Sequence, residues 1–300
     1  MTTSTISPRR ARAMWSLFEP IHGVTYFSPE PRAAYEAAGL RGYWRGYFAG
    51  RAAPLGPVGA APVIAMFSGF SPPFVRRALP AVWSLATPEA ALEARAVGAV
   101  AALRRIAPDA AAAERAAAVL EDAVAALDFA GHPLGAANAD LPRPDEPHAR
   151  LWQAATTLRE HRGDGHVAAL VSAGLAGIDV LILRAALDIS RELLQSVRGW
   201  TDDEWAAATA RLTADGLLHA DGSISDLGRE RVSAVEDATE RAASAAWSSL
   251  SADKIVLVAK ALLPISRVCA DELPEQTPLG LFDVWDAGAD PSAASVRWPA

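Results

Sequence analysis

The chain of 300 residues is 51% hydrophobic and 21% charged, a balance typical of globular proteins. Its formal net charge of −7 argues against a general electrostatic attraction to nucleic acid or anionic lipid. The single cysteine, Cys269, excludes an internal disulfide framework and a thiolate cage for a metal ion. The length is sufficient for one large domain or two ordinary ones with a real core.

No segment is typical of a targeting signal or a membrane span. The N-terminus is polar and then basic, and it lacks the apolar stretch of a secretory signal. The longest uncharged run lies between Arg51 and Arg76, but five prolines and three glycines interrupt it. We therefore expect a cytoplasmic protein with no membrane partner.

The N-terminal half predicts a series of helices. Ser7-Pro8 and Ser28-Pro29 each place a capping serine before a proline at the first helical position. Between Arg41 and Arg51, aromatic residues alternate with arginines. This pattern favours an amphipathic helix with its rings in the core and its arginines in solvent over a surface on which nucleic-acid bases stack. Alanine-rich helices are expected from Thr87 to Arg105 and from Ala110 to Phe129.

A loop-like segment from His132 to Pro147, with four prolines, is the best candidate for a domain boundary. We therefore predict a helical domain over residues 1–147, a winged-helix-like domain with flanking helices over 148–272, and a tail over 273–300. Apolar residues of the tail that can dock on the rest of the protein are Leu281, Phe282, Val284 and Trp285.

The segment from Leu151 to Asp179 combines two apolar helical patterns with a dense group of proton-active side chains. Between the patterns, residues 162–165 predict a polar turn, because their two glycines break a helix. In this interpretation Asp164 caps the following helix. His161 and His166 then stand on either side of the turn.

Two interpretations of this turn remain open. In the structural interpretation, a histidine at a helix C-terminus precedes a glycine stop and an aspartate cap. In the functional interpretation, His161 and His166 are acid/base groups, Arg162 binds an anion, and Asp164 or Glu19 is the orienting carboxylate. A small-molecule site, with or without catalysis, would follow from the second interpretation.

A metal site is a further alternative. Glu19 and His22 have the Glu-x-x-His spacing that places both side chains on one helical face and that recurs in four-helix di-iron proteins. If this pair lies alongside His161 and His166, the four residues could hold a divalent metal through nitrogen and oxygen. A histidine packed at a helix end is the competing interpretation of the same spacing.

The clearest indication of fold lies in the C-terminal half. A short helix is expected over residues 191–197, and Thr201 to Glu204 form a capping box for a second helix that stops at Gly216. Residues 217–225 have two short extended runs around an Asp-Gly turn, which predicts a β-hairpin. Ser225 then caps a long helix.

This order of elements, from Arg191 to Arg241, resembles the winged helix-turn-helix of MarR-like regulators. Together with the segments at 19–22, 41–51 and 159–166, it also resembles an actinobacterial protein family, which implies a fold but no activity. In MarR-like regulators the second helix of the motif enters the DNA major groove.

That second helix lacks the chemistry that reads DNA. Its first turn carries Asp202, Asp203 and Glu204, its middle is mainly alanine, and Arg211 is its only cation. Between Trp200 and Leu250 there are ten acidic residues and four arginines, a balance that phosphate would repel. We therefore expect that DNA is not a partner.

The sequence as a whole predicts a mainly α protein with a small β-hairpin wing, in which a helical N-terminal part packs on a winged-helix-like part. The predicted function is small-molecule binding in a pocket floored by residues 160–166. The alternative is a MarR-like transcription regulator in which the pocket binds an effector and a homodimer presents the helices to DNA. No motif for a known cofactor is present.

Overall fold

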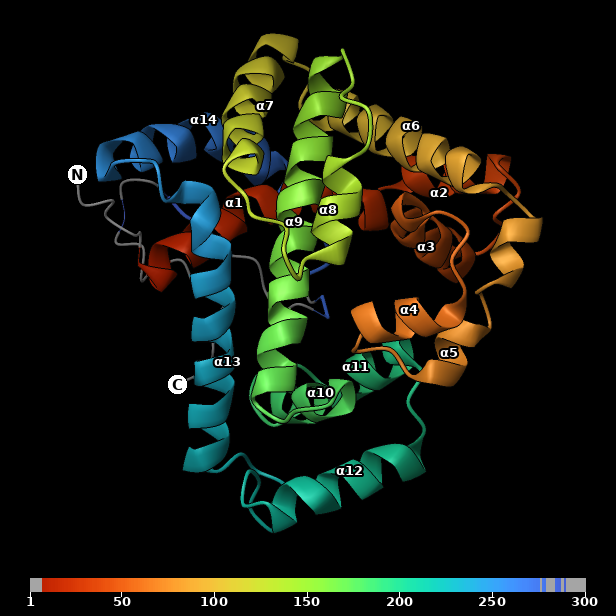
Figure 1. Ribbon diagram of the computed structural model, residues 1–300, viewed down its shortest axis with the longest axis vertical. Coiled ribbons are helices and arrows are strands. Elements are labelled where there is room, and N and C mark those ends of the chain that lie inside the picture. Colours follow the sequence, from red (N-terminus) through yellow and green to blue (C-terminus); the bar gives the residue numbers. More distant parts are fainter. Residues whose placement is uncertain (1–6, 276, 279–283, 287–288, 290–300) are drawn as a thin grey trace.

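The computed structural model describes residues 7–275, 277, 278, 284–286 and 289, and this part of the chain contains fourteen α-helices and no β-strand (Figure 1). The prediction of a mainly α protein is confirmed. The α-helices are α1 (Pro8–Phe27), α2 (Pro29–Ala37), α3 (Tyr43–Ala52), α4 (Ala60–Met66), α5 (Pro72–Arg76), α6 (Pro88–Ile106), α7 (Ala110–Ala125), α8 (Pro133–Ala139), α9 (Pro147–Ser172), α10 (Gly177–Ala185), α11 (Arg191–Arg198), α12 (Asp202–Ala214), α13 (Asp226–Ala243) and α14 (Ala252–Ala270). Short 3-10 helices span Ala53–Leu55, Ala81–Ser84 and Ser244–Trp247.

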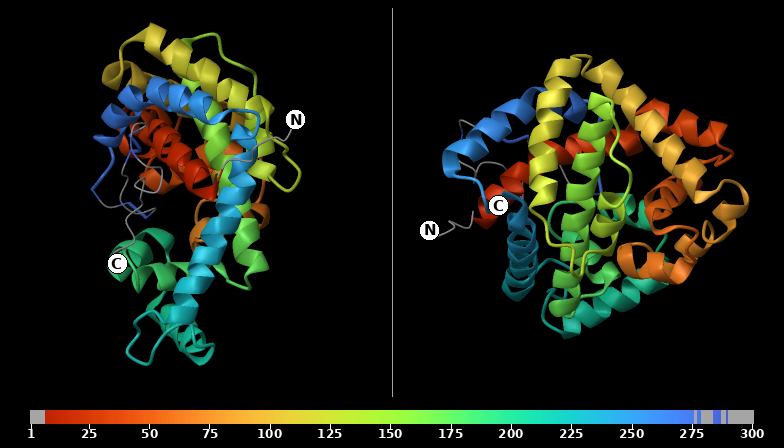
Figure 2. Two further views of the ribbon diagram at one scale, coloured as in Figure 1. Left: turned by 90° about the vertical axis from the view of Figure 1, so that its left-hand side faces the viewer. Right: turned by 45° about the horizontal axis from the view of Figure 1, so that its top comes forward.

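Helix α9 is the central element of the fold. It contacts α1, α6, α7, α8 and α13, which surround it on several sides (Figure 1). Three hydrophobic clusters fill the spaces between the helices: one joins α1, α7, α9 and α14, the second lies among α2 to α6, and the third joins the end of α9 to α10–α13. Helix α12 and the turn after it lie at one end of the molecule, and α13 leads back from there (Figure 2).

Local capping explains where many of these helices begin. The side chains of Ser7, Thr87, Thr201 and Ser225 each accept a hydrogen bond from a backbone N–H in the first turn of the helix that follows. In the tail, Trp285 is 3% exposed and packs into the first cluster, and its backbone N–H donates to Ser16 Oγ at 3.0 Å. Two other tail residues predicted to dock, Leu281 and Phe282, lie outside the described residues.

The predicted β-hairpin wing is wrong. Residues 217–225 form a turn with a single isolated bridge between Leu218 and Ile224, and the described chain has no strand there. The two extended segments of the expected hairpin are too short to pair as strands. The first begins directly after the helix stop at Gly216. The second ends where Ser225 turns its hydroxyl to the N–H of Gly228 and caps α13.

The predicted break at residues 162–165 is also wrong, because α9 continues through them as one helix of 26 residues. The two glycines lower the helical propensity, but tertiary packing outweighs this cost. A Cβ atom on Gly165 would lie 3.2 Å from the Cβ of Ala242 in α13 and 3.3 Å from Cε1 of His132. The glycine is therefore a site of close approach between α9 and its neighbours.

None of the described helices is by itself long and apolar enough to cross a membrane. Helices α9 and α10 satisfy the length and composition only when taken together, and they are bent by 92° at their junction. The division into residues 1–147, 148–272 and 273–300 stays a prediction.

Candidate functional site

A cavity of about 180 Å³ lies between the N-terminal helices and the helices that lead into α12. Five arginines line it, and we call it the arginine cavity. They come from four helices: Arg51 from α3, Arg159 and Arg162 from α9, Arg184 from α10, and Arg198 from α11. Among the described residues that line the cavity, Glu19 is the one carboxylate.

Stacking on aromatic rings fixes three of these guanidinium groups. Arg51 lies over the ring of Phe67 at 3.9 Å, Arg162 over that of Trp15 at 4.2 Å, and Arg198 over that of Phe70 at 4.4 Å. All three rings also line the cavity. The walls therefore combine aromatic surface with cationic groups held in defined positions.

Behind the wall, Glu160 forms ion pairs with two of the arginines. Its two carboxylate oxygens accept hydrogen bonds from Arg51 Nε and Nη2, both at 2.8 Å, and Arg159 Nη1 approaches at 3.1 Å. Glu160 is 1% exposed. Burial alone raises its pKa, but the two guanidiniums outweigh burial and hold that pKa well below its usual range. Glu160 is therefore a structural anion and does not face the cavity as a base.

Arg162 and Glu19 meet at the floor of the cavity. Arg162 Nη2 donates to Glu240 at 2.6 Å, but its Nε is buried without a hydrogen-bond partner in the described chain. Glu19 accepts from the indole N–H of Trp15 at 2.8 Å and lies 3.5 Å from Arg159. The predicted anion-binding role of Arg162 and the orienting role of Glu19 stay predictions, now with both residues at one cavity.

Arg198 is the arginine of this set without a carboxylate partner in the described part of the chain. Its Nε is likewise buried without a hydrogen-bond partner among these residues. Burial lowers the pKa of Arg198, and the nearby Arg51 and Arg159 act in the same direction, while Tyr47 opposes them. By contrast, Arg184 on α10 is paired with Asp188 at 2.7 Å.

His166 lines the same cavity and presents a proton acceptor. Thr239 Oγ1 donates to the carbonyl of Val235 at 2.8 Å, so the hydroxyl oxygen accepts from His166 Nδ1 at 3.0 Å. Burial lowers the pKa of His166, which keeps the ring neutral at pH 7. With the proton on Nδ1, Nε2 has a free lone pair that can accept a hydrogen bond.

The other residues of the predicted cluster are elsewhere. His161 is five positions before His166 on a continuous helix, so the two rings leave it on different faces. His161 Nε2 lies 3.0 Å from the carbonyl of Asp128, and its ring stacks on His132 with centroids 3.7 Å apart. Asp164 Oδ2 accepts from the N–H groups of residues 134 and 135, at 2.8 and 2.9 Å. It therefore caps α8 and not the second half of its own helix.

His22 is also separated from the cavity. It is 1% exposed, with Nδ1 at 3.0 Å from Thr156 Oγ1 and Nε2 at 3.2 Å from the hydroxyl of Tyr26. Within the described ranges, no group of three His, Cys, Asp or Glu side chains is arranged to hold a metal ion. The hypothesis of a divalent metal at His161, His166, His22 and Glu19 gains no support, because these side chains bond to different neighbours.

Sequence reasoning found only Arg162 among the five arginines of the cavity and missed Arg51, Arg159, Arg184 and Arg198. Arg51 was expected in solvent with Arg41 and Arg45, which are indeed exposed, but its side chain is only 10% exposed. Its burial depends on Glu160, which is 109 positions away in the sequence. For Arg198 the sequence offers no signal, since it ends a short helix and stands between Val197 and Gly199.

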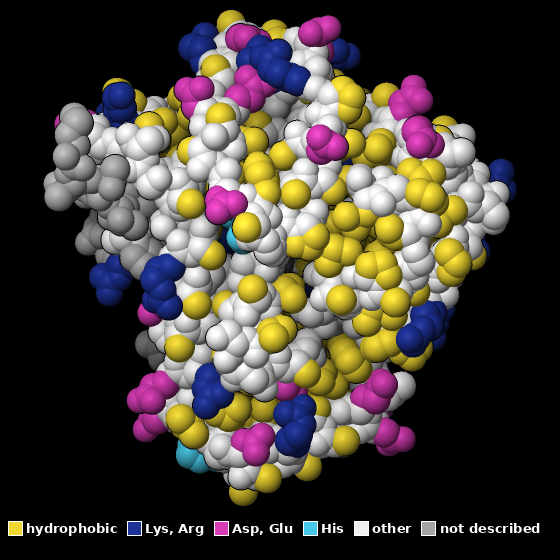
Figure 3. Space-filling model, viewed as in Figure 1, with side chains coloured by type: hydrophobic (Ala, Val, Ile, Leu, Met, Phe, Trp, Pro, Cys, Tyr) yellow, Lys and Arg dark blue, Asp and Glu magenta, His cyan; other side chains and the backbone are white. Residues whose placement is uncertain are grey.

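Helix α12, the counterpart of the helix that enters DNA in MarR-like regulators, has the acidic surface that its sequence predicted. Asp202 and Asp203 are exposed, and Arg211, the one cation of α12, forms an ion pair with the buried Asp179. In the view of Figure 3, the end of the molecule where α12 lies carries side chains of both charges and no continuous basic surface. The pairing of Arg211 removes a charge that could otherwise contact phosphate.

Comparison with known proteins gives one match. Neither a search of curated proteins nor a search of solved structures found a similar chain. A protein-family model described as "Helix-turn-helix family" matches residues 11–275. The match spans nearly the whole chain, including the α11–α12 pair. The description of the family does not mention MarR-like regulators. The chain therefore belongs to this helix-turn-helix family.

Proposed function

We propose that the protein binds a small anionic molecule in the arginine cavity. The observation that carries this proposal is the set of five guanidinium groups around one cavity, among which Arg198 has no carboxylate partner in the described part of the chain. A buried charge without a partner is costly. An anion in the cavity would supply the counter-charge.

Arginine suits this role, because its planar fork of N–H groups matches the oxygens of a carboxylate or a phosphate. The aromatic walls at Trp15, Phe67 and Phe70 hold the guanidiniums in place before a ligand arrives, which lowers the entropic cost of binding. The predicted roles of Arg162, His166 and Glu19 as ligand-binding or acid/base groups are part of this proposal.

The test is calorimetric titration of the full chain with two probes, inorganic phosphate and benzoate. We expect at least one of them to bind the wild type. Arg198→Met should abolish this binding, whereas Arg76→Met, which removes the same charge from the exposed surface of α5, should not. Without ligand, Arg198→Met should match or exceed the wild type in stability, because an apolar side chain often replaces a buried charge without loss. Equal binding by Arg198→Met would refute the proposal.

A second candidate function is ligand-responsive transcription regulation of the MarR-like type, which family membership favours. One structural observation also favours it. The loop that lines the cavity at residues 67–70 is hydrogen-bonded to the α11–α12 junction: Ser71 N donates to the carbonyl of Arg198 at 2.9 Å, and Trp200 Nε1 donates to that of Gly69 at 3.0 Å. A ligand in the cavity would contact the segment that positions α12.

The charge on α12 opposes this second candidate, since its exposed carboxylates would repel phosphate. Gel-shift titrations on the DNA upstream of the protein's own gene, at several salt concentrations and with or without benzoate, distinguish the two. Specific nanomolar retention that responds to the probe would establish the regulator. The expected homodimer stays a proposal, and sedimentation of the full chain tests it.

A further inference from the structure

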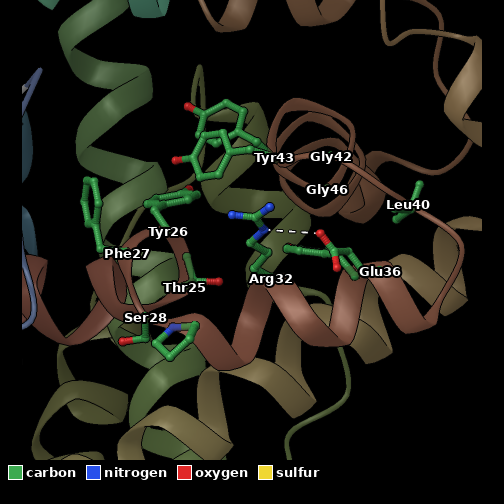
Figure 4. Close-up of a pocket in the computed structure, with 13 residues that line it drawn as sticks. Thr25, Tyr26, Phe27, Ser28, Arg32, Glu36, Leu40, Gly42, Tyr43 and Gly46 are labelled. Carbon is green, nitrogen blue, oxygen red and sulfur yellow. Dashed lines mark hydrogen bonds and ion pairs between the residues drawn. The ribbon is translucent and has the colours of Figure 1, made fainter.

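A second cavity of about 380 Å³ adjoins the arginine cavity, between the end of α1, α2 and the start of α3 (Figure 4). It is lined by all four tyrosines of the chain, and we call it the tyrosine cavity: Tyr26, Tyr35, Tyr43 and Tyr47. Most of its remaining wall comes from α2 and from Gly42 and Gly46, and at Gly46 a Cβ would lie 2.8 Å from the ring of Tyr35.

The wall of the tyrosine cavity contains a buried hydroxyl group. Thr25 is 5% exposed, and its hydroxyl opposes the rise in the pKa of Tyr35 that burial causes. At the exposed rim Arg32 Nε lies 3.2 Å from Glu36, and Figure 4 shows Arg32 between that carboxylate and Tyr26. The cavity therefore offers flat aromatic surface with a hydroxyl donor, which suits a ring that carries hydrogen-bond acceptors.

Tyr47 lines both cavities. On one side its hydroxyl accepts a hydrogen bond from Arg51 Nη1 at 3.2 Å, within the arginine set. On the other side, its ring centroid is 5.1 Å from that of Tyr26 and 6.2 Å from that of Tyr43. One side chain is thus the partition between a cationic compartment and an aromatic compartment.

The polar groups of the arginine cavity favour a phosphate ester over a carboxylate. The guanidiniums approach from four different helices, and a tetrahedral phosphate can accept from several directions, whereas a carboxylate presents its oxygens in one plane. His166 Nε2 is a hydrogen-bond acceptor, and an ionised carboxylate has no hydrogen to donate to it. A phosphate monoester has a second pKa near 6 and retains a P–OH group in its monoanion, which can donate to this nitrogen.

We propose that the two cavities form one site for a phosphate monoester of an aromatic or heterocyclic molecule, with the phosphate in the arginine cavity and the ring among the tyrosines. This inference rests on the proposed function, and it names the ligand class. Volume supports it, because the arginine cavity alone is smaller than ordinary ligand sites of roughly 300–1,000 Å³, and both compartments together fall within that range.

The experiment compares three probes by calorimetry on the full chain at pH 6: inorganic phosphate, 1-naphthyl phosphate and 1-naphthoate. We expect 1-naphthyl phosphate to bind about tenfold or more tightly than either of the others. Tyr43→Ala should reduce its affinity to that of inorganic phosphate and leave inorganic phosphate unchanged. Tyr43 is 40% exposed, so the variant should fold, and Tyr43→Phe, which keeps the ring, is its matched control. His166→Leu should reduce the preference for 1-naphthyl phosphate over 1-naphthoate.

The outcomes separate the two proposals. If 1-naphthoate binds as tightly as 1-naphthyl phosphate, or if inorganic phosphate does, the arginine cavity still binds anions but the inferred ligand class is wrong. If 1-naphthyl phosphate binds equally to the wild type and to Arg198→Met, the ring has a separate apolar site and the two-compartment site is refuted. If none of the probes binds the wild type, the proposed function fails together with this inference.

Discussion

Replacing Asp164 with asparagine isolates the effect of one buried carboxylate on the pH dependence of stability. Asp164 is 5% exposed, and a single oxygen, Oδ2, accepts both N–H groups at the start of α8. The carbonyl oxygen of an asparagine can accept the same two hydrogen bonds. The substitution therefore keeps the cap and removes the charge.

The magnitude follows from the pKa of this group. Burial raises the pKa of Asp164 from 3.8 to about 6, although its hydrogen bonds act in the opposite direction. At about 1.4 kcal/mol per pKa unit, this shift corresponds to about 3 kcal/mol. Because the folded state binds the proton more tightly than the unfolded state, the stabilisation is complete below pH 3.8 and is lost as the pH rises through about 6.

Urea denaturation followed by tryptophan fluorescence, at intervals between pH 4 and pH 7, measures the effect. Relative to wild type, Asp164→Asn should gain stability across this interval by an amount approaching about 3 kcal/mol. Asp140→Asn makes the same change of charge at the exposed C-terminal end of α8 and is the control. If the curves for Asp164→Asn and Asp140→Asn run parallel, the carboxylate does not ionise as argued.

Three further predictions concern the core and the cavity walls. Glu160→Gln removes the counter-charge of the buried Arg51 and one of the two carboxylates beside Arg159, and it should lower the free energy of unfolding by about 3–5 kcal/mol in urea. Gly98→Ala places a Cβ 2.3 Å from Cα of Pro31 and should cost about 1–3 kcal/mol, whereas Val97→Ala, at an exposed position of the same helix, should cost little. Burial acts to raise the pKa of Tyr47, but three nearby arginines outweigh this effect, so the pKa is lowered. Tyr47 should therefore be the first tyrosine to ionise in an ultraviolet titration, and Tyr47→Phe should remove that step.

The sequence predicted the helices well where their limits are set locally. The capping serine before Pro8, the Thr201–Glu204 box and the serine cap at Ser225 each act within three or four residues, so the pattern alone is sufficient. The same local reasoning failed at Gly163 and Gly165. Whether two glycines break a helix depends on what packs against them, and those neighbours come from α13 and from the loop before α8.

The candidate site was predicted only in part, for a related reason. Arg162, His166 and Glu19 reach the cavity because their own helices turn them toward it. Treating residues 162–165 as a turn placed His161 beside His166, whereas a continuous helix separates the two rings. The contribution of Arg51 required a partner more than a hundred positions away, which no spacing in the sequence reveals.

The arginine cavity is hard to explain as a requirement of the fold. A buried guanidinium stabilises a protein only when its charge is matched and its N–H groups are bonded, and apolar side chains of similar size often do better. Arg51 and Arg159 meet the first condition through Glu160 and Glu19, but Arg198 has no carboxylate partner in the described part of the chain, and its Nε has no hydrogen-bond acceptor there. An anionic ligand that binds only the folded chain supplies the counter-charge that Arg198 lacks, and by mass action it raises the stability of the folded state. Arg198 thus separates the two explanations: a structural arginine would destabilise the empty protein when removed, whereas a ligand-binding one would not.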